Sequence, residues 1–244
     1  MDLRARIVTD PCAIGHAPSP TAAMRFRLEP LLPPDCVAEL QAALQADDTP
    51  WRPGEETAGW HARTVKNNHQ LDRRSTLHAA LMQPIREALQ AHPLFAAAAL
   101  PLRVHSLRFS RSEAGEGYGR HVDNACMDEG RSDLSFTVFL SDPASYEGGD
   151  LVLEHPDHEE AIRLPAGHAF VYPSTLLHRV EPVRSGTRLV AVGWVQSRIR
   201  RSEERELLFE LDTARRSLFA REGKSEVFDL LCRSYANLLR LWGE

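Results

Sequence analysis

The segment Leu134-Ser-Phe-Thr-Val-Phe-Leu140 alternates strictly between two sets of side chains. Leucine, phenylalanine and valine take every second position, whereas Ser135, Thr137 and Phe139 take the positions between them. Because neighbouring side chains of a strand point to opposite faces, this segment predicts a strand with one face in an apolar core. Ser135 and Thr137 share the other face, where small hydroxyls either line the pocket of a polar ligand or are ordinary strand residues.

Further short strands are predicted on both sides of this segment, between residues 103 and 195. Turn sequences rich in glycine and proline separate them, such as Glu147-Gly-Gly-Asp150 and Pro165-Ala-Gly167. The expected strands are Val104–Ser110, Leu151–Leu153, Ala169–Tyr172 and Thr187–Val195. Several short strands with turns between them favour a β-sandwich or barrel.

Helical patterns flank this β core, so the chain is expected to be mainly β with flanking helices. A strand over residues 24–28 should precede a helix that starts within Pro33-Pro34-Asp35 and runs to Gln45. A loop over residues 47–59 and a helix from Ser75 to about Ala91 should follow. Pro84 should kink or split that second helix. The expected divisions are an irregular N-terminal extension (1–23), a strand with supporting helices (24–100), the β core (101–198) and a C-terminal helical segment (199–244).

The composition limits the location and the partners of the chain. Its 244 residues are 43% hydrophobic and 26% charged, which is typical of a soluble globular protein. A formal net charge of -5 gives no reason to expect a nucleic acid or a membrane as a partner. The four cysteines form no CxxC pair, and no secretory signal or membrane-spanning run is evident, so a cytoplasmic location is expected.

Candidate metal ligands lie just before the central strand. In His121-Val-Asp123 the two polar residues are two positions apart, so an extended backbone directs both side chains to one side. By itself this tripeptide is better explained by a hydrogen-bonded surface histidine. With His178, it provides two imidazoles and one carboxylate, a three-ligand face that is typical of non-haem Fe(II) oxygenases.

Arg188 is the candidate anion-binding residue. It shares a predicted strand face with two valines and Trp194, where a buried charge needs a partner. A hairpin over residues 184–186 would bring it to the same cavity as His178. Its partner is either a structural carboxylate such as Glu181 or the carboxylate of a bound ligand, and the nearby metal ligands favour the second.

Two further polar segments have alternative explanations. His155-Pro-Asp-His158-Glu-Glu160 is either a second metal cluster or, in better agreement with its polar surroundings, a solvated hairpin loop. Lys66-Asn-Asn68 lies in a long polar loop and is either part of a lid over the substrate or a loop held by asparagine hydrogen bonds. The leucine-rich stripes after Ser202 would pack onto the core or across a homodimer.

From about Leu31 to the C-terminus, the sequence resembles the PKHD-type hydroxylases, which are Fe(II)- and 2-oxoglutarate-dependent dioxygenases related to prolyl and lysyl hydroxylases. The resemblance is carried by Val65–Asn68, Arg74–Leu77, Phe95–Pro101, Tyr118–Asn124, Phe139–Asp142, Tyr146–Leu151, Leu164–Gly167, Tyr172–His178, Leu208–Asp212 and Asn237–Arg240. It implies a double-stranded β-helix, a jelly-roll barrel with helices packed outside.

The resemblance also implies roles for individual residues. Fe(2+) would be bound by the catalytic residues His121, Asp123 and His178, and 2-oxoglutarate by Arg188. Related enzymes often place a second co-substrate contact, a tyrosine, where this chain has Phe139, so that contact would fall to Thr137, Ser135 or Tyr118. Trp194, Asn124 and Phe139 are expected to wall the substrate cavity, although Trp194 fits core packing equally well. L-Ascorbate is a further family requirement.

The expected activity is hydroxylation of a C–H bond in a peptidyl or small-molecule substrate, with succinate and CO2 as co-products and a link to iron uptake. A non-catalytic sensor of iron or 2-oxoglutarate on the same scaffold is the main alternative. A zinc hydrolase with the same three ligands ranks last, because it would leave Arg188 without a role.

Overall fold

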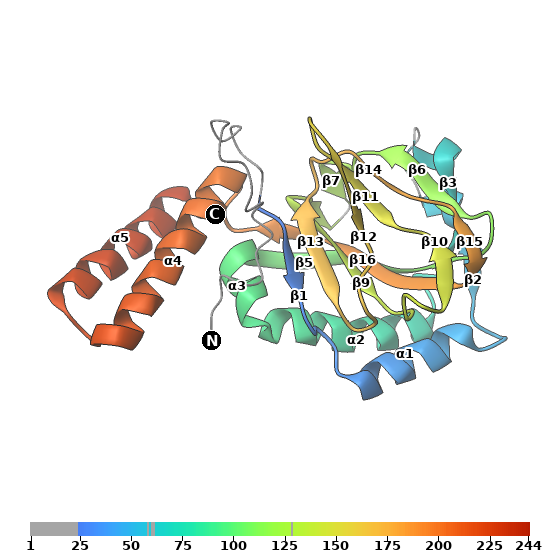
Figure 1. Cartoon of the computed structure of the whole chain (residues 1–244), viewed down its shortest axis with the longest axis horizontal. Coiled ribbons are helices and arrows are strands. Elements are labelled where there is room, and N and C mark those ends of the chain that lie inside the picture. The colour runs from blue at the N-terminus through green and yellow to red at the C-terminus, as the bar shows by residue number, and fades with distance from the viewer. Residues whose placement is uncertain (1–23, 58, 60–61, 128) are drawn as a thin grey trace.

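The computed structural model describes residues 24–57, 59, 62–127 and 129–244, so the expected N-terminal extension lies outside the described residues. Two antiparallel sheets pack against each other, and helices lie outside them (Figure 1). This arrangement is the predicted jelly-roll architecture, mainly β with flanking helices. No described helix is both long and apolar enough to cross a membrane.

The larger sheet has seven strands in the order β1-β13-β9-β16-β5-β4-β2. Their bounds are β1 Phe26–Leu28, β2 Trp51–Pro53, β4 His69–Leu71, β5 Pro101–Ser112, β9 Leu134–Phe139, β13 Ala169–Pro173 and β16 Arg188–Ser197. Strand β9, which contains the alternating Ser135, Thr137 and Phe139, is hydrogen-bonded to β13 and β16 and buried along its whole length.

The smaller sheet has five strands in the order β12-β11-β14-β6-β3. Their bounds are β3 Lys66–Asn67, β6 Gly117–His121, β11 Leu151–Glu154, β12 Glu159–Ile162 and β14 His178–Val180. Two short pairs complete the strands, β7 Cys126–Met127 with β8 Gly130–Arg131, and β10 Tyr146–Gly148 with β15 Val183–Gly186.

The alternation of β9 has the predicted physical cause. Leu134, Phe136 and Val138 join the core that lies between the larger sheet and its helices. Phe139 points the other way and joins a second cluster, formed with Leu151 and other residues of the smaller sheet. The period-2 pattern therefore places Ser135 and Thr137 between the two sheets.

The helices on the outer face are α1 Pro34–Gln45, α2 Thr76–Ala91 and α3 Pro93–Ala99. The expectation that Pro84 splits α2 was wrong, since one helix runs through it. Proline removes the donor to the carbonyl of Ala80, and that exposed residue can be hydrated instead. The expected loop over residues 47–59 was also partly wrong, because it contains β2 and a 3-10 helix, η2 Gly54–Thr57. A second 3-10 helix is η3 Ala62–Val65.

The predicted hairpin between His178 and Arg188 was wrong as well. Strand β14 pairs with β6 and β11 in the smaller sheet, whereas β16 pairs with β5 and β9 in the larger sheet. The intervening strand β15 pairs with β10. The chain therefore crosses from one sheet to the other between the two residues, which reach the same cavity from opposite walls.

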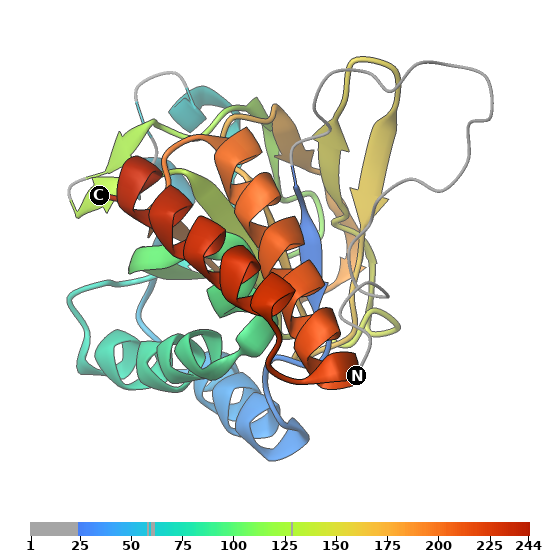
Figure 2. The ribbon, with the colours of Figure 1, turned by 90° about the vertical axis from the view of Figure 1, so that its left-hand side faces the viewer.

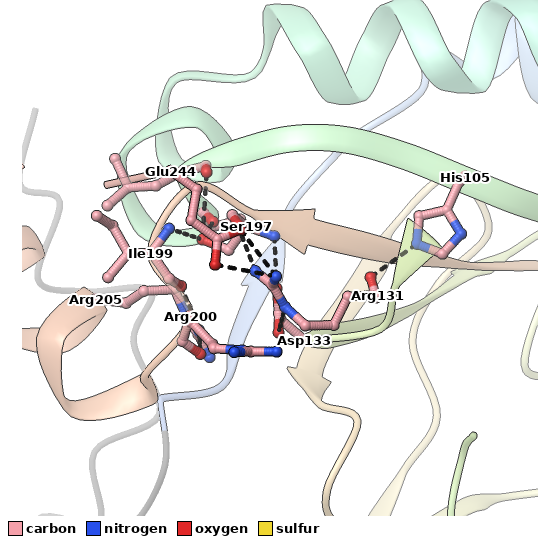
Figure 3. A network of polar contacts seen from close by, with 10 residues as sticks. His105, Arg131, Asp133, Ser197, Ile199, Arg200, Arg205 and Glu244 are labelled. Carbon is pink, nitrogen blue, oxygen red and sulfur yellow. Dashed lines mark hydrogen bonds and ion pairs between the residues drawn. The ribbon is translucent and has the colours of Figure 1, made fainter. Parts of the chain in front are cut away.

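Helices α4 Ser202–Glu222 and α5 Glu226–Trp242 form an antiparallel pair beside the sheets (Figures 1 and 2). Polar contacts attach this pair to the end of the larger sheet (Figure 3). Arg131 binds Glu244 at 2.9 Å and Asp133 at 2.8 Å, and Asp133 accepts the backbone N–H of Ser197. Arg205 donates to the carbonyl oxygen of Ile199. Both ends of the helical pair are thus held at one place.

Candidate functional site

His121, Asp123 and His178 converge between the two sheets. One ligand atom from each lies within 4.8 Å of the others, and no other such group of three His, Cys, Asp or Glu is found among the described residues. The distance from Asp123 to the Nε2 atom is 3.9 Å for His121 and 3.8 Å for His178. The two histidines are cross-strand partners on β6 and β14. This donor set suits Fe(II), Mn(II) or Zn(II).

The hydrogen bonds of both histidines turn the same nitrogen toward Asp123. Nδ1 of His121 lies 2.8 Å from the carbonyl oxygen of Gly119, and Nδ1 of His178 lies 3.0 Å from that of Leu176. A carbonyl oxygen only accepts, so each Nδ1 carries the proton and each Nε2 of the neutral ring keeps its lone pair. Both lone pairs are thus available to a metal.

The electrostatics of His121 agree with that assignment. Burial, together with the neighbouring His178, lowers the pKa of His121 to about 4. At neutral pH the ring is therefore uncharged. His121 and Asp123 then lie close together as two potential metal ligands and do not form an ion pair. The ring of Tyr118 stacks on His121 with 3.7 Å between centroids and fixes its plane.

Two serines hold the carboxylate of Asp123. The hydroxyl of Ser135 donates to Oδ2 of Asp123 at 2.6 Å, and Ser174 lies 2.8 Å from the same hydroxyl. Because the single proton of Ser135 goes to Asp123, Ser174 is the donor in the second bond. The alternation of β9 predicts a hydroxyl in the pocket, and the structure gives it this carboxylate partner. Ser174 could not be assigned from the sequence.

The cluster opens into a cavity of about 110 Å³ between the sheets. Arg188, Thr137, Tyr172 and Trp194 contribute to its lining from the larger sheet. Arg188 is only 3% exposed. Arg188 and the metal cluster thus line one pocket, as the sequence predicted.

Arg188 has no carboxylate partner among the described residues. Glu181, the structural alternative, instead accepts a hydrogen bond from Arg179 at 2.6 Å. Nε of Arg188 is buried and has no acceptor in the described part of the chain. Burial lowers the pKa of Arg188, and the neighbouring Tyr146 offsets only part of that effect. A buried guanidinium of this kind fits an anionic ligand that completes its hydrogen bonds.

The surroundings of Arg188 include contacts that the sequence did not indicate. Gly149 has a φ of +67°, and a Cβ there would lie 2.8 Å from Cδ of Arg188, so glycine makes room for the side chain. The hydroxyl of Tyr146 interacts directly with the guanidinium, whereas Tyr172 affects it only electrostatically and has its hydroxyl at Thr137. Phe139 offers its ring instead of a hydroxyl, 5.8 Å from the guanidinium.

The remaining predicted residues lie near the metal cluster or at the rim. Trp194 lines the cavity and stacks with Arg108, whose guanidinium lies 5.7 Å from its ring. Asn124 is exposed and lines the cavity close to Gly59. The alternative cluster around His155 is a hairpin, in which Glu160 binds Arg25 at 2.5 Å.

Comparison with known proteins identifies the class to which this fold and site belong. The 2OG-Fe(II) oxygenase superfamily matches residues 107–196, and the PKHD-type hydroxylase C-terminal domain matches residues 203–244. A PKHD-type hydroxylase of Synechococcus elongatus is 56% identical over 225 residues, which is 91% of this chain and 100% of that protein. One from Prochlorococcus marinus is 49% identical over 214 residues, which is 88% of this chain and 97% of the relative.

Solved structures agree in fold. A prolyl hydroxylase from Trichoplax adhaerens, in complex with a hypoxia inducible factor peptide fragment, is 13% identical with a TM-score of 0.54, over 75% of this chain and 86% of that chain. A 2OG-Fe(II) oxygenase family oxidoreductase from Burkholderia pseudomallei is 14% identical with a TM-score of 0.50. The match covers 70% of this chain and 84% of that chain.

The chain is thus a 2-oxoglutarate-dependent dioxygenase. More narrowly, it belongs to the PKHD-type hydroxylase family, as its sequence predicted. Membership implies Fe(2+) and 2-oxoglutarate as cofactor and co-substrate.

Proposed function

We propose that this hydroxylase binds iron through His121, Asp123 and His178, and 2-oxoglutarate through Arg188. The observation that carries the proposal is the shared pocket. Two imidazole Nε2 lone pairs and a carboxylate converge in the same cavity as a buried arginine that has no carboxylate partner among the described residues. A zinc hydrolase would use the same ligands but would leave that arginine without a role.

The residues of the chain prepare the site before the cofactors bind. The backbone carbonyls at Gly119 and Leu176 keep the histidines in the correct tautomer, and Ser135 orients the carboxylate. Arg188 would hold the distal carboxylate of 2-oxoglutarate, and the Tyr172 hydroxyl, which also lines the cavity, would be the second contact that Phe139 cannot provide. Bound iron, with dioxygen and 2-oxoglutarate, supplies the oxidation of a substrate C–H bond, with succinate and CO2 as co-products.

The substrate is proposed as a peptidyl or small molecule, and the links to iron uptake and to L-ascorbate come from the family resemblance alone. A homodimer through the C-terminal helices and a cytoplasmic location also stay predictions. The dimer is supported by the exposed side chains of Val227, Leu230 and Leu241 on α5, which are 60%, 59% and 74% exposed.

The direct test of this function is succinate formation. Purified protein with Fe(II), 2-oxoglutarate and oxygen should release succinate slowly by uncoupled turnover, and a screen of substrates should find those that raise the rate above this background. A protein that binds both cofactors and forms no succinate would instead be the sensor, an alternative that family membership does not favour.

Ser135 provides a test of how the carboxylate is held. Ser135→Ala should weaken iron binding about 10-fold to 100-fold, because partners that orient a metal ligand contribute affinity of that size. Ser132→Ala is the matched control, since that buried hydroxyl has no hydrogen-bond partner among the described residues. Equal iron affinities in the two variants, measured by anaerobic titration, would rule out the proposed role of Ser135.

A further inference from the structure

Lys66 is a buried cation that the proposed iron and 2-oxoglutarate sites do not use. It is one of only two lysines in the chain and is 8% exposed on β3, at the edge of the smaller sheet. Lys66 lines the cavity, and its ammonium group donates to the hydroxyl of Thr57 at 3.0 Å and lies 5.1 Å from the centre of the Tyr118 ring. A buried lysine whose only hydrogen-bond partner is a neutral hydroxyl lowers the stability of the fold unless an anion pairs with its charge.

No described carboxylate is close enough to compensate Lys66. Asp123 acts on it only at longer range, while burial and Arg108 lower its pKa to about 7. Two of the three N–H groups of an ammonium also remain for other acceptors after the bond to Thr57. The lysine therefore presents unused donors to the cavity.

Another side chain that lines this cavity also has an unused donor. Trp194 is 9% exposed, lines the same cavity, and its indole N–H has no acceptor among the described residues. The nearby acceptor Oε1 of Gln70 already receives hydrogen bonds from Thr57 and Arg108. A ligand that satisfies this part of the cavity must supply acceptor oxygens, and negative charge would suit the lysine.

This group is separate from Arg188. Trp194 and Arg188 lie on the same strand, six residues apart, which is about 20 Å along a β-strand. In the proposed function 2-oxoglutarate has one carboxylate at Arg188 and its other end at the metal cluster. It therefore has no carboxylate left for Lys66 and Trp194. An anion at Lys66 and Trp194 would belong to a second molecule.

We propose that Lys66 and Trp194 form a subsite for a carboxylate group of the substrate that is hydroxylated. The inference rests on the proposed function, because that function assigns the other end of the cavity to 2-oxoglutarate. It narrows the substrate class to acids, whether small molecules or peptides with a free carboxylate near the reacting carbon.

Calorimetry on protein loaded with Zn(II) and 2-oxoglutarate tests the subsite without turnover, since Zn(II) accepts the same ligands and has no redox chemistry. The probes are acetate, N-acetylglycine as a mimic of a peptide C-terminus, and inorganic phosphate. Acetamide and N-acetylglycinamide are the uncharged analogues of the first two. At least one acid should bind, its amide should bind at least about tenfold more weakly, and Lys66→Met should abolish the difference. Preference for acetate or N-acetylglycine distinguishes a small acid from a peptide terminus.

Two variants and one spectrum complete the test. Lys66→Arg should restore binding of the acid, and Lys224→Met, at the other and exposed lysine, should leave it unchanged. With 13Cε-labelled lysine, the acid should shift the Lys66 signal and leave the Lys224 signal in place. Failure of every acid to bind, equal binding by Lys66→Met, or a response to phosphate alone would overturn the proposal. Failure of Zn(II) or 2-oxoglutarate to bind would count instead against the proposed function.

Discussion

His178→Ala should lose tight iron binding. The change removes one of two imidazoles from a cluster whose three ligand atoms lie within 4.8 Å, and no other described His, Cys, Asp or Glu side chain joins that cluster. Residues that only hydrogen-bond to a metal ligand already contribute about 10-fold to 100-fold in metal affinity. Loss of the ligand itself should therefore weaken iron binding by at least about 100-fold. Anaerobic titration with Fe(II) measures this effect.

His168→Ala is the control for that experiment. His168 is half-buried near the start of β13 and is not part of the metal cluster. Its replacement should leave the iron affinity unchanged. If His178→Ala and His168→Ala bind iron equally well, the metal does not occupy the proposed site.

Arg188→Met should raise the dissociation constant of 2-oxoglutarate by at least about 30-fold, since the loss of one partner of a buried charge pair costs about 2–5 kcal/mol. Iron binding should persist, because Arg188 is not a ligand. Arg52→Met, at an exposed ion pair with Asp72, should leave both affinities unchanged. Isothermal titration with Fe(II)- or Zn(II)-loaded protein gives both constants.

The same variant separates a ligand-binding arginine from a structural one. Arg188 has no carboxylate partner among the described residues, and burial disfavours its charge. Without 2-oxoglutarate, Arg188→Met should therefore unfold at the same temperature as the wild type or at a higher one. A lower melting temperature together with an unchanged 2-oxoglutarate affinity would assign Arg188 a structural role instead.

The sequence predicted the parts of the site that local periodicity controls. A period of two in β9 fixes which residues face the cavity, so the position of Ser135 and Thr137 between the sheets followed from the pattern alone. The convergence of His121 and Asp123 followed from their spacing. These inferences needed no knowledge of how distant strands pair.

Predictions that depend on long-range pairing were less successful. A ten-residue spacing allowed a hairpin between His178 and Arg188, but the intervening strand pairs with β10, which places the two residues on opposite sheets. The roles of Tyr146 and Tyr172 depend on the same packing. Likewise, the bond from Arg131 to Glu244 joins residues 113 positions apart, and no local pattern indicates it.

The central claim is that one cavity holds iron at His121, Asp123 and His178 and 2-oxoglutarate at Arg188. Anaerobic addition of Fe(II) and 2-oxoglutarate tests it most directly, because chelation of iron by the co-substrate produces a charge-transfer band in the visible spectrum. The wild type should show this band, and His121→Ala should lack it. Absence of the band from wild-type protein that has bound iron would contradict the account.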